Sequence, residues 1–215
     1  MRIGILGTGV VGKTLGSKLA KLGHDVRMGS RKAGGDQAKA WVKEAGSKSS
    51  EGTFAGAAAH GEMVFNCTSG MGSLEALNAA GARNLEGKVL VDVANPLDFS
   101  KGMPPTLSVC NTDSLGEQIQ RAFPTAKVVK TLNTVTAAAM VEPSIIPGVH
   151  TMFVSGNDAK AKAEVVNFLK TGFGWKEVMD LGDISCARAQ EMHLALWVRL
   201  YMKLQTPNVN VHVAR

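Results

Sequence analysis

Arg2-Ile3-Gly4-Ile5-Leu6-Gly7-Thr8-Gly9-Val10-Val11-Gly12 is the stretch that decides the fold of this chain. Its first part is a short, largely apolar run typical of a buried parallel strand, and its second part has the spacing G-x-G-x-x-G. Apolar residues then recur about one helical turn apart up to Gly23, and residues 25–28 have the pattern of a second strand. The stretch therefore predicts a complete βαβ unit.

The three glycines of this motif have separate physical tasks. Gly7 allows the tight turn after the strand, Gly9 lets the backbone approach a pyrophosphate, and Gly12 lets the helix pack closely on the strand. The amino terminus of the following helix presents free N–H groups and partial positive charge, so a dinucleotide diphosphate is its natural ligand. Glycine-rich turns also occur for purely structural reasons, but the flanking strand and helix favour cofactor binding here.

The end of the second strand selects the cofactor. A site that prefers NAD has an acidic residue there, which accepts a hydrogen bond from the ribose 2′-hydroxyl, whereas this chain has Ser30, Arg31 and Lys32. Arginine forms paired hydrogen bonds with a phosphate, and serine can donate another. The sequence therefore predicts NADP(H) rather than NAD(H), with a solvated basic turn as the alternative.

Strand and helix patterns alternate along most of the chain. Strand patterns cover residues 2–6, 25–28, 51–54, 63–67, 88–93, 127–132, 150–155 and 175–179, and helical patterns cover residues 11–22, 35–45, 55–60, 73–82, 113–123, 159–171 and about 183–203. This alternation predicts an α/β fold, namely a Rossmann-like, doubly wound and mostly parallel sheet with a C-terminal helix. We divide the chain into an NADP-binding domain, residues 1–183, and a C-terminal helix and tail, residues 184–215.

Small or polar residues follow three of the predicted strands. They are Thr68 and Ser69, then Ala94, Asn95 and Pro96, and finally Asn133 and Thr134. Ligands of doubly wound sheets lie beyond the carboxyl ends of the strands, so we expect the nicotinamide end of the cofactor there. Asn133 and Thr134 are the candidates for orienting the reacting rings. Polar residues also end many strands without binding anything, and each strand end taken alone fits either interpretation.

The last helix is apolar along one long face, which holds Met192, Leu196, Leu200 and Leu204, with Trp197 and Tyr201 beside them. Three interpretations fit this face: it covers the ligand cleft, packs on its own sheet, or contacts a second subunit. We predict a homodimer through this helix. Residues 209–213 alternate like a strand and could extend a sheet edge.

Composition excludes several function classes. No apolar run approaches the roughly 18 residues of a spanning helix, and the chain starts directly in a strand, so we expect a cytoplasmic protein with no signal peptide and no membrane partner. The 3 cysteines are far apart and the 5 histidines lack metal-ligand spacing, which argues against a disulfide framework and against a metal site. The net charge of +6 is spread without a basic cluster, so an anionic cofactor or a generally solvated surface explains it better than a nucleic-acid partner.

Taken together, these residues resemble the NADP oxidoreductase family that works with the deazaflavin coenzyme F420, and its flavin-linked relatives, including the cytosolic reductase domains of membrane metalloreductases. The glycine motif and Gly29-Ser30-Arg31 resemble the cofactor site of that family. More specific signatures are Phe123-Pro124 with residues 128–135, and Asp180-Leu181-Gly182 with residues 187–191. The resemblance covers nearly the whole chain.

The resemblance implies a direct hydride transfer between C4 of the nicotinamide and C5 of a deazaflavin or N5 of a flavin. It implies that the pyrophosphate is bound by Thr8, Gly9, Val10 and Val11. It also implies that Ser30 and Arg31 bind the 2′-phosphate, and that Asn133 and Ala137 lie near the nicotinamide. The archaeal coenzyme F420 enzymes tend to have His at the position of Asn133, and the flavin-linked relatives often have Asn. The small-molecule redox partner, which is coenzyme F420, FMN or FAD, therefore stays open.

Several different functions share this N-terminal unit or its cofactor. β-Hydroxyacid dehydrogenases and imine reductases add a large helical domain after the sheet, often with a catalytic lysine, and this chain has room for one long helix. A non-catalytic NADP(H)-sensing module and a flavin or ferric reductase would also use the predicted cofactor site. The sequence shows no Ser-His-Asp or His-carboxylate arrangement that indicates acid-base catalysis, which fits a reaction carried by the cofactors.

Overall fold

The computed structural model describes residues 1–214 and has one large sheet at its centre. Eight strands lie in the order β10-β9-β8-β5-β4-β1-β2-β3. Their bounds are β1 (Arg2–Leu6), β2 (Asp25–Ser30), β3 (Ser49–Thr53), β4 (Met63–Asn66), β5 (Val89–Asp92), β8 (Lys127–Thr131), β9 (Thr151–Ser155) and β10 (Glu177–Asp180). Every neighbouring pair is parallel except β8 and β9, so β9 and β10 run opposite to the rest. The predicted Rossmann-like, mostly parallel sheet is confirmed.

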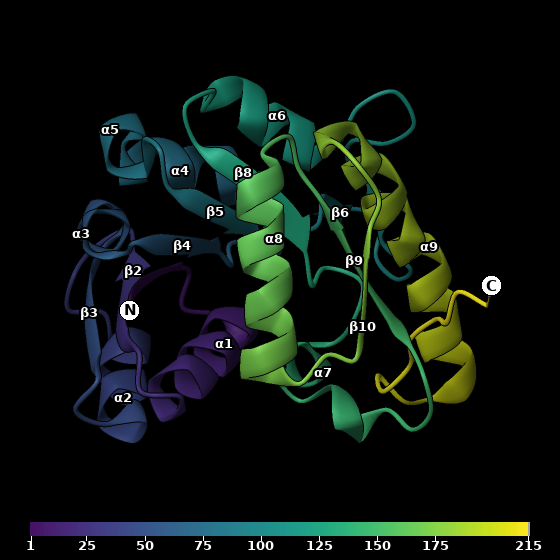
Figure 1. The fold of residues 1–215 in the computed structure, drawn as a ribbon, viewed down its shortest axis with the longest axis horizontal. Coiled ribbons are helices and arrows are strands. Elements are labelled where there is room, and N and C mark those ends of the chain that lie inside the picture. The colour runs from purple at the N-terminus through teal and green to yellow at the C-terminus, as the bar shows by residue number, and fades with distance from the viewer. Residues whose placement is uncertain (215) are drawn as a thin grey trace.

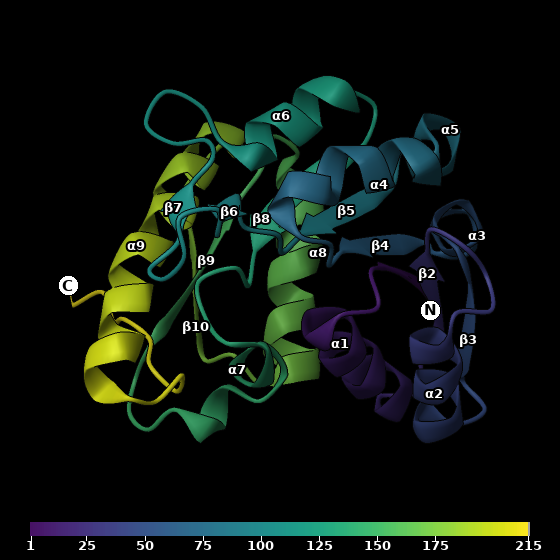
Figure 2. The ribbon, with the colours of Figure 1, turned by 180° about the vertical axis from the view of Figure 1, so that it is seen from behind.

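Helices cover both faces of this sheet (Figure 1, Figure 2). One face carries α1 (Val10–Lys21), α2 (Asp36–Ala45), α7 (Ala137–Val141) and α8 (Ala159–Phe168). The other carries α3 (Phe54–His60), α4 (Ser73–Ala80), α5 (Ala82–Leu85) and α6 (Leu115–Ala122). The long helix α9 (Ala187–Leu204) stands at the side of the molecule away from the N-terminus (Figure 1). Short helical turns are η1 (Gly70–Gly72), η2 (Pro143–Ile145), the π-helical η3 (Leu169–Phe173) and η4 (Ile184–Cys186).

The central strands are apolar because both of their faces are buried. Ile3 and Ile5 of β1 and Phe65 of β4 belong to one core, whereas Val64 of β4 and Leu90 of β5 point into the other. A strand covered by helices on both sides has no solvated face, so it is a nearly continuous apolar run rather than an alternating one. The strand patterns of the sequence follow from this burial.

Local signals set several element boundaries. The Ser114 hydroxyl accepts a hydrogen bond from the Glu117 N–H at 3.1 Å, as expected for the residue before the first turn of α6. Gly81 has φ of 88° and divides the helix predicted at 73–82 into α4 and α5. Between β5 and α6, outside the predicted strand and helix ranges, lies a small hairpin of β6 (Leu97–Asp98) and β7 (Thr106–Leu107), whose strands are too short to show any periodicity.

The C-terminal tail differs from a regular strand. Residues 209–213 have no strand assignment, although the Thr151 N–H at the start of β9 donates to the Val211 carbonyl at 2.9 Å. The Trp197 indole N–H donates to the Val209 carbonyl at 3.2 Å. Thr151 also accepts hydrogen bonds from the Asn210 amide at 3.2 Å and from the Val213 N–H at 3.3 Å, so the tail joins the start of β9 to α9 without forming a strand ladder.

Candidate cofactor site

The turn between β1 and α1 opens onto a cavity of about 700 Å³. Gly7 has φ of 120°, and a Cβ there would lie 2.7 Å from the Cys67 carbonyl oxygen, so no other residue fits. A Cβ on Gly12 would collide with the carbonyl oxygen of Gly7, whereas one on Gly9 would meet no atom within 4 Å. The fold itself thus requires Gly7 and Gly12, while Gly9 faces open space.

Helix α1 begins at the edge of this cavity. Its N-cap is Gly9, and among residues 1–214 no side chain caps it and no acidic residue occupies its first turn. The first backbone N–H groups of a helix have no partner within the helix, and they carry partial positive charge. The beginning of α1 can therefore accept an anionic diphosphate, which is the arrangement predicted from the glycine spacing.

The end of β2 forms the far wall of the same cavity. Ser30, Arg31 and Lys32 all line it, and the Ser30 hydroxyl donates to the Lys32 carbonyl at 2.6 Å, which holds the turn together. Arg31 and Lys32 are exposed, and neither forms an ion pair with a charged group of the described chain. Two cations without a protein partner at this position fit a ligand phosphate.

A second cavity, of about 230 Å³, adjoins the first. The two share Cys67, Thr68 and Ser69 at the end of β4, so they lie side by side at the carboxyl ends of the parallel strands. Its walls are largely apolar and include Val135, Met140, and Leu194 and Trp197 of α9. The chain reverses its strand order between β1 and β4, which is where ligands of doubly wound sheets bind.

The structure brings most of the predicted site residues to these two cavities. The first is lined by Gly7, Thr8, Gly9, Ser30, Arg31 and Lys32, the second by Val11, Ala94, Asn95, Asn133 and Ala137, and both by Thr68 and Ser69. Val10, Gly12, Pro96 and Thr134 line neither cavity. Thr134 is fully buried, whereas Val10 is 74% exposed to solvent.

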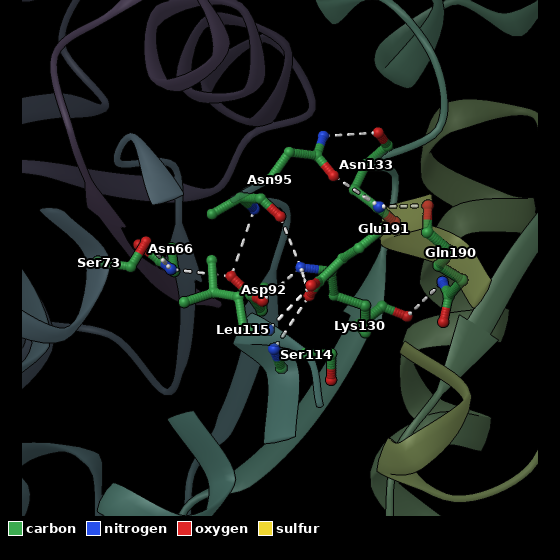
Figure 3. A network of polar contacts seen from close by, with 12 residues as sticks. Asn66, Ser73, Asp92, Asn95, Ser114, Leu115, Lys130, Asn133, Gln190 and Glu191 are labelled. Carbon is green, nitrogen blue, oxygen red and sulfur yellow. Dashed lines mark hydrogen bonds and ion pairs between the residues drawn. The ribbon is translucent and has the colours of Figure 1, made fainter. Parts of the chain in front are cut away.

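A buried ionic cluster is part of the polar network drawn in Figure 3, and it contacts Ala94, which lines the second cavity. The ammonium of Lys130 is 2.8 Å from Asp92 Oδ2 and 2.8 Å from Glu191 Oε1, and it donates to the Ala94 carbonyl at 2.5 Å. All three charged side chains are buried. Burial alone would lower the pKa of Lys130, but the carboxylates of Asp92 and Glu191 outweigh it and raise that pKa, so the lysine stays charged.

The ionic cluster extends to the strand ends on both sides. Asn66 donates to Asp92 at 2.8 Å and accepts from the Thr68 hydroxyl at 2.7 Å, so it links the cluster to the shared wall of the two cavities. Sequence reasoning missed this network. The available signal was an aspartate and a lysine that each directly follow apolar residues within a predicted buried strand, Asp92 after Val91 and Lys130 after Val129.

Asn95 and Asn133 form a reciprocal pair at the second cavity (Figure 3). The Asn95 amide donates to the Asn133 carbonyl at 2.8 Å, and the Asn133 amide donates to Asn95 Oδ1 at 2.9 Å and to the Gln190 carbonyl at 3.1 Å. Asn133 Oδ1 is buried and accepts no hydrogen bond from residues 1–214. Leu132, just before the pair, has φ of 63°, a strained conformation that is concentrated at functional sites.

The His-carboxylate pairs of the structure lie away from these cavities. Two His-carboxylate pairs that the sequence did not indicate, His60 with Asp25 and His212 with Glu177, have N–O distances of 3.4 Å, and none of these residues lines either cavity. Within residues 1–214, no group of three or more His, Cys, Asp or Glu side chains is placed to bind a metal. None of the helices in that range is both long enough and apolar enough to span a bilayer.

Known proteins are similar to this chain in both sequence and fold. Residues 2–96 match the family described as NADP oxidoreductase, coenzyme F420-dependent. A solved structure from Arthrobacter sp. FB24, provisionally assigned as an F420-dependent NADP reductase, is 54% identical over 100% of both chains, with a TM-score of 0.96.

Two further solved structures share the fold alone. A reductive aminase from Aspergillus terreus, solved in complex with NADPH and ethyl levulinate, is 20% identical over 95% of this chain and 62% of that chain, with a TM-score of 0.66. An imine reductase from Streptomyces aurantiacus is 18% identical over 95% of this chain and 64% of that chain, with a TM-score of 0.64.

Proposed function

This chain belongs to the coenzyme F420-dependent family of NADP oxidoreductases, and on that premise we propose that it transfers a hydride between NADPH and a deazaflavin such as coenzyme F420, or a flavin. The observation that carries the proposal is that two adjoining cavities share the wall at the end of β4. The first has the features that bind phosphates, and the second has apolar walls suited to aromatic rings.

The residues of the first cavity bind and orient the cofactor. We assign the diphosphate to the backbone N–H groups at the start of α1, beside Gly9, and the 2′-phosphate to Ser30, Arg31 and Lys32. These contacts fix one end of an extended molecule, so its other end must follow the shared wall at Thr68 into the second cavity.

The residues of the second cavity align the reacting rings. The bound nicotinamide supplies or accepts a hydride at C4, and the ring of the deazaflavin or flavin is the other reactant. Val11, Val135 and Leu194 form an apolar wall, and Asn95 and Asn133 supply polar groups that orient a ring against it. Placing two rings in contact without water provides most of what such a reaction requires from a protein.

Helix α9 contributes to this second cavity. Leu194 and Trp197 of α9 form part of its wall, so we propose that this helix covers the ring pocket. The apolar side chains of α9 that remain exposed, Leu196 and Leu204 among them, are the surface through which we propose a homodimer.

The test is NADPH oxidation with coenzyme F420, FMN, FAD and a ferric chelate as separate acceptors. Turnover with F420 alone would identify a deazaflavin partner, and turnover with FMN or FAD would identify a flavin partner. Reduction of the ferric chelate only when a flavin is present would identify a flavin or ferric reductase. Tight NADPH binding with no turnover on any acceptor would contradict the proposal and support a non-catalytic NADP(H)-sensing module.

A further inference from the structure

Resting on the proposed function, we propose that Lys130 is a positioning residue for the nicotinamide. It acts with Glu191 to fix the Asn95–Asn133 pair so that Asn133 Oδ1 accepts a hydrogen bond from the carboxamide N–H of the bound cofactor. Lys130 touches neither cavity, so it acts entirely through the residues that it holds.

Lys130 joins three separate segments. Its ammonium forms ion pairs with Asp92 at the end of β5 and with Glu191 on α9, and it donates a hydrogen bond to the Ala94 carbonyl. Ala94 immediately precedes Asn95, and Glu191 immediately follows Gln190. The one ammonium therefore fixes the backbone on both sides of Asn133.

The two backbone positions fixed in this way determine the orientation of the Asn133 amide. Its Nδ2 group donates to Asn95 Oδ1 and to the Gln190 carbonyl, so both of its acceptors belong to residues adjacent to the contacts of Lys130. Rotating the amide by half a turn would set Oδ1 against two oxygens, which excludes the rotated form. The orientation of Oδ1 is therefore fixed.

Asn133 Oδ1 is left as a free acceptor. The side chain is 1% exposed, and Oδ1 has no donor within residues 1–214, yet Asn133 lines the second cavity. A buried acceptor without a donor is destabilising, and a ligand N–H removes that cost on binding. A carboxamide is the part of a nicotinamide ring that offers such a donor.

The charges of the ionic cluster keep the lysine in place. Lys130 faces two carboxylates, and the second of these, Glu191, also accepts from the Leu115 N–H at 2.8 Å and the Gly116 N–H at 3.0 Å, at the start of α6. The amino terminus of α6 therefore compensates the negative charge that Lys130 alone would leave unbalanced. Because the lysine is firmly ionised and shielded from solvent, its role is geometric and not that of a proton donor.

The test compares three ligands by equilibrium titration, followed by intrinsic tryptophan fluorescence. NADP⁺ has the carboxamide, its 3-acetylpyridine analogue has an acetyl group without N–H donors, and 2′,5′-ADP lacks the ring altogether. Lys130→Met is expected to weaken NADP⁺ about tenfold, the scale of one hydrogen bond, and to change the other two ligands less than twofold. The control Lys127→Met removes a partly exposed lysine of the same strand and should leave all three affinities unchanged.

A second variant covers the case in which Lys130→Met does not fold. Glu191→Gln retains the shape of the side chain but removes one of the two charges facing Lys130, and it is expected to show the same selective loss for NADP⁺. Equal weakening of all three ligands, or no loss for NADP⁺ in a folded variant, would overturn the positioning role. Failure of the wild-type protein to bind NADP⁺ would instead overturn the proposed function.

Discussion

Gly116 of α6 lies directly against Ala187 at the start of α9, and a Cβ added to Gly116 would be 2.9 Å from the Cβ of Ala187. This close approach brings the first N–H groups of α6 within reach of the Glu191 carboxylate. A glycine far from the turn between β1 and α1 is therefore needed for the ionic cluster of Lys130, Asp92 and Glu191.

We expect Gly116→Ala to lower the free energy of unfolding by about 1–3 kcal/mol, because the new methyl group must displace α9 from α6. Urea denaturation measures this change in the free energy of unfolding. Gly52→Ala is the matched control, since its Cβ would come no closer than 3.8 Å to any atom, and it should change stability by less than about 0.5 kcal/mol. Equal stability of both variants would show that the helices have room to separate.

Gly9→Ala should separate binding from folding. The new Cβ would have no described protein atom within 4 Å, so the free energy of unfolding should change by less than about 0.5 kcal/mol. The same Cβ enters the space assigned to the diphosphate. We expect NADPH affinity to fall at least about tenfold, or about 1.4 kcal/mol, by fluorescence titration. Gly12→Ala should instead destabilise the fold, because its Cβ would collide with the Gly7 carbonyl. Unchanged NADPH affinity in Gly9→Ala would place the diphosphate elsewhere.

Arg31→Ala should weaken NADPH binding by roughly 1.5–3 kcal/mol and barely affect NADH, because only the phosphorylated cofactor offers a group for a charge-assisted contact. Isothermal titration with both cofactors measures the difference. Arg83→Ala removes an exposed arginine of α5 and should leave both affinities unchanged. A similar loss for NADPH and NADH would remove the 2′-phosphate role from Arg31.

Asp113 should contribute stability that disappears in acid. Hydrogen bonds from the Arg121 guanidinium lower the pKa of Asp113 to about 2 from an ordinary value of 3.8. Because the folded state has the lower pKa, the stabilisation is complete above pH 4 and is lost as the pH falls towards 2. Arg121 is largely exposed, so the contribution is about 1 kcal/mol or less. The unfolding free energies of wild type and Asp113→Asn should therefore converge as the pH falls from 5 to 2, and a constant difference would disprove this origin.

The apolar face of α9 should mediate dimer formation. Leu196 and Leu204 are 51% and 55% exposed, and Tyr201 and Met202 are exposed beside them. Burying such side chains in a second copy is favourable, and a charge in their place would oppose it. We expect a dimer mass by light scattering, and a monomer mass for Leu196→Glu with an unchanged circular dichroism spectrum. A monomer mass for the wild type at assay concentration would refute the dimer.

Local sequence was sufficient to predict many of the residues that line the first cavity. The glycine spacing and the basic end of β2 each depend on a few consecutive residues, whose backbone preferences and charges act without long-range partners. The strand patterns predicted the parallel sheet for the same reason, since burial on both faces selects an apolar run in each strand separately.

Contacts between distant segments were decided only by the tertiary structure. Three features depend on segments that lie far apart in the chain. They are the reversed direction of β9 and β10, the position of α9 beside the second cavity, and the ionic cluster of Lys130, Asp92 and Glu191. By sequence alone Lys130 is one polar residue in a strand. It becomes a buried ion only because folding places two carboxylates beside it and the start of α6 beside one of them. Local sequence preferences do not determine these long-range contacts.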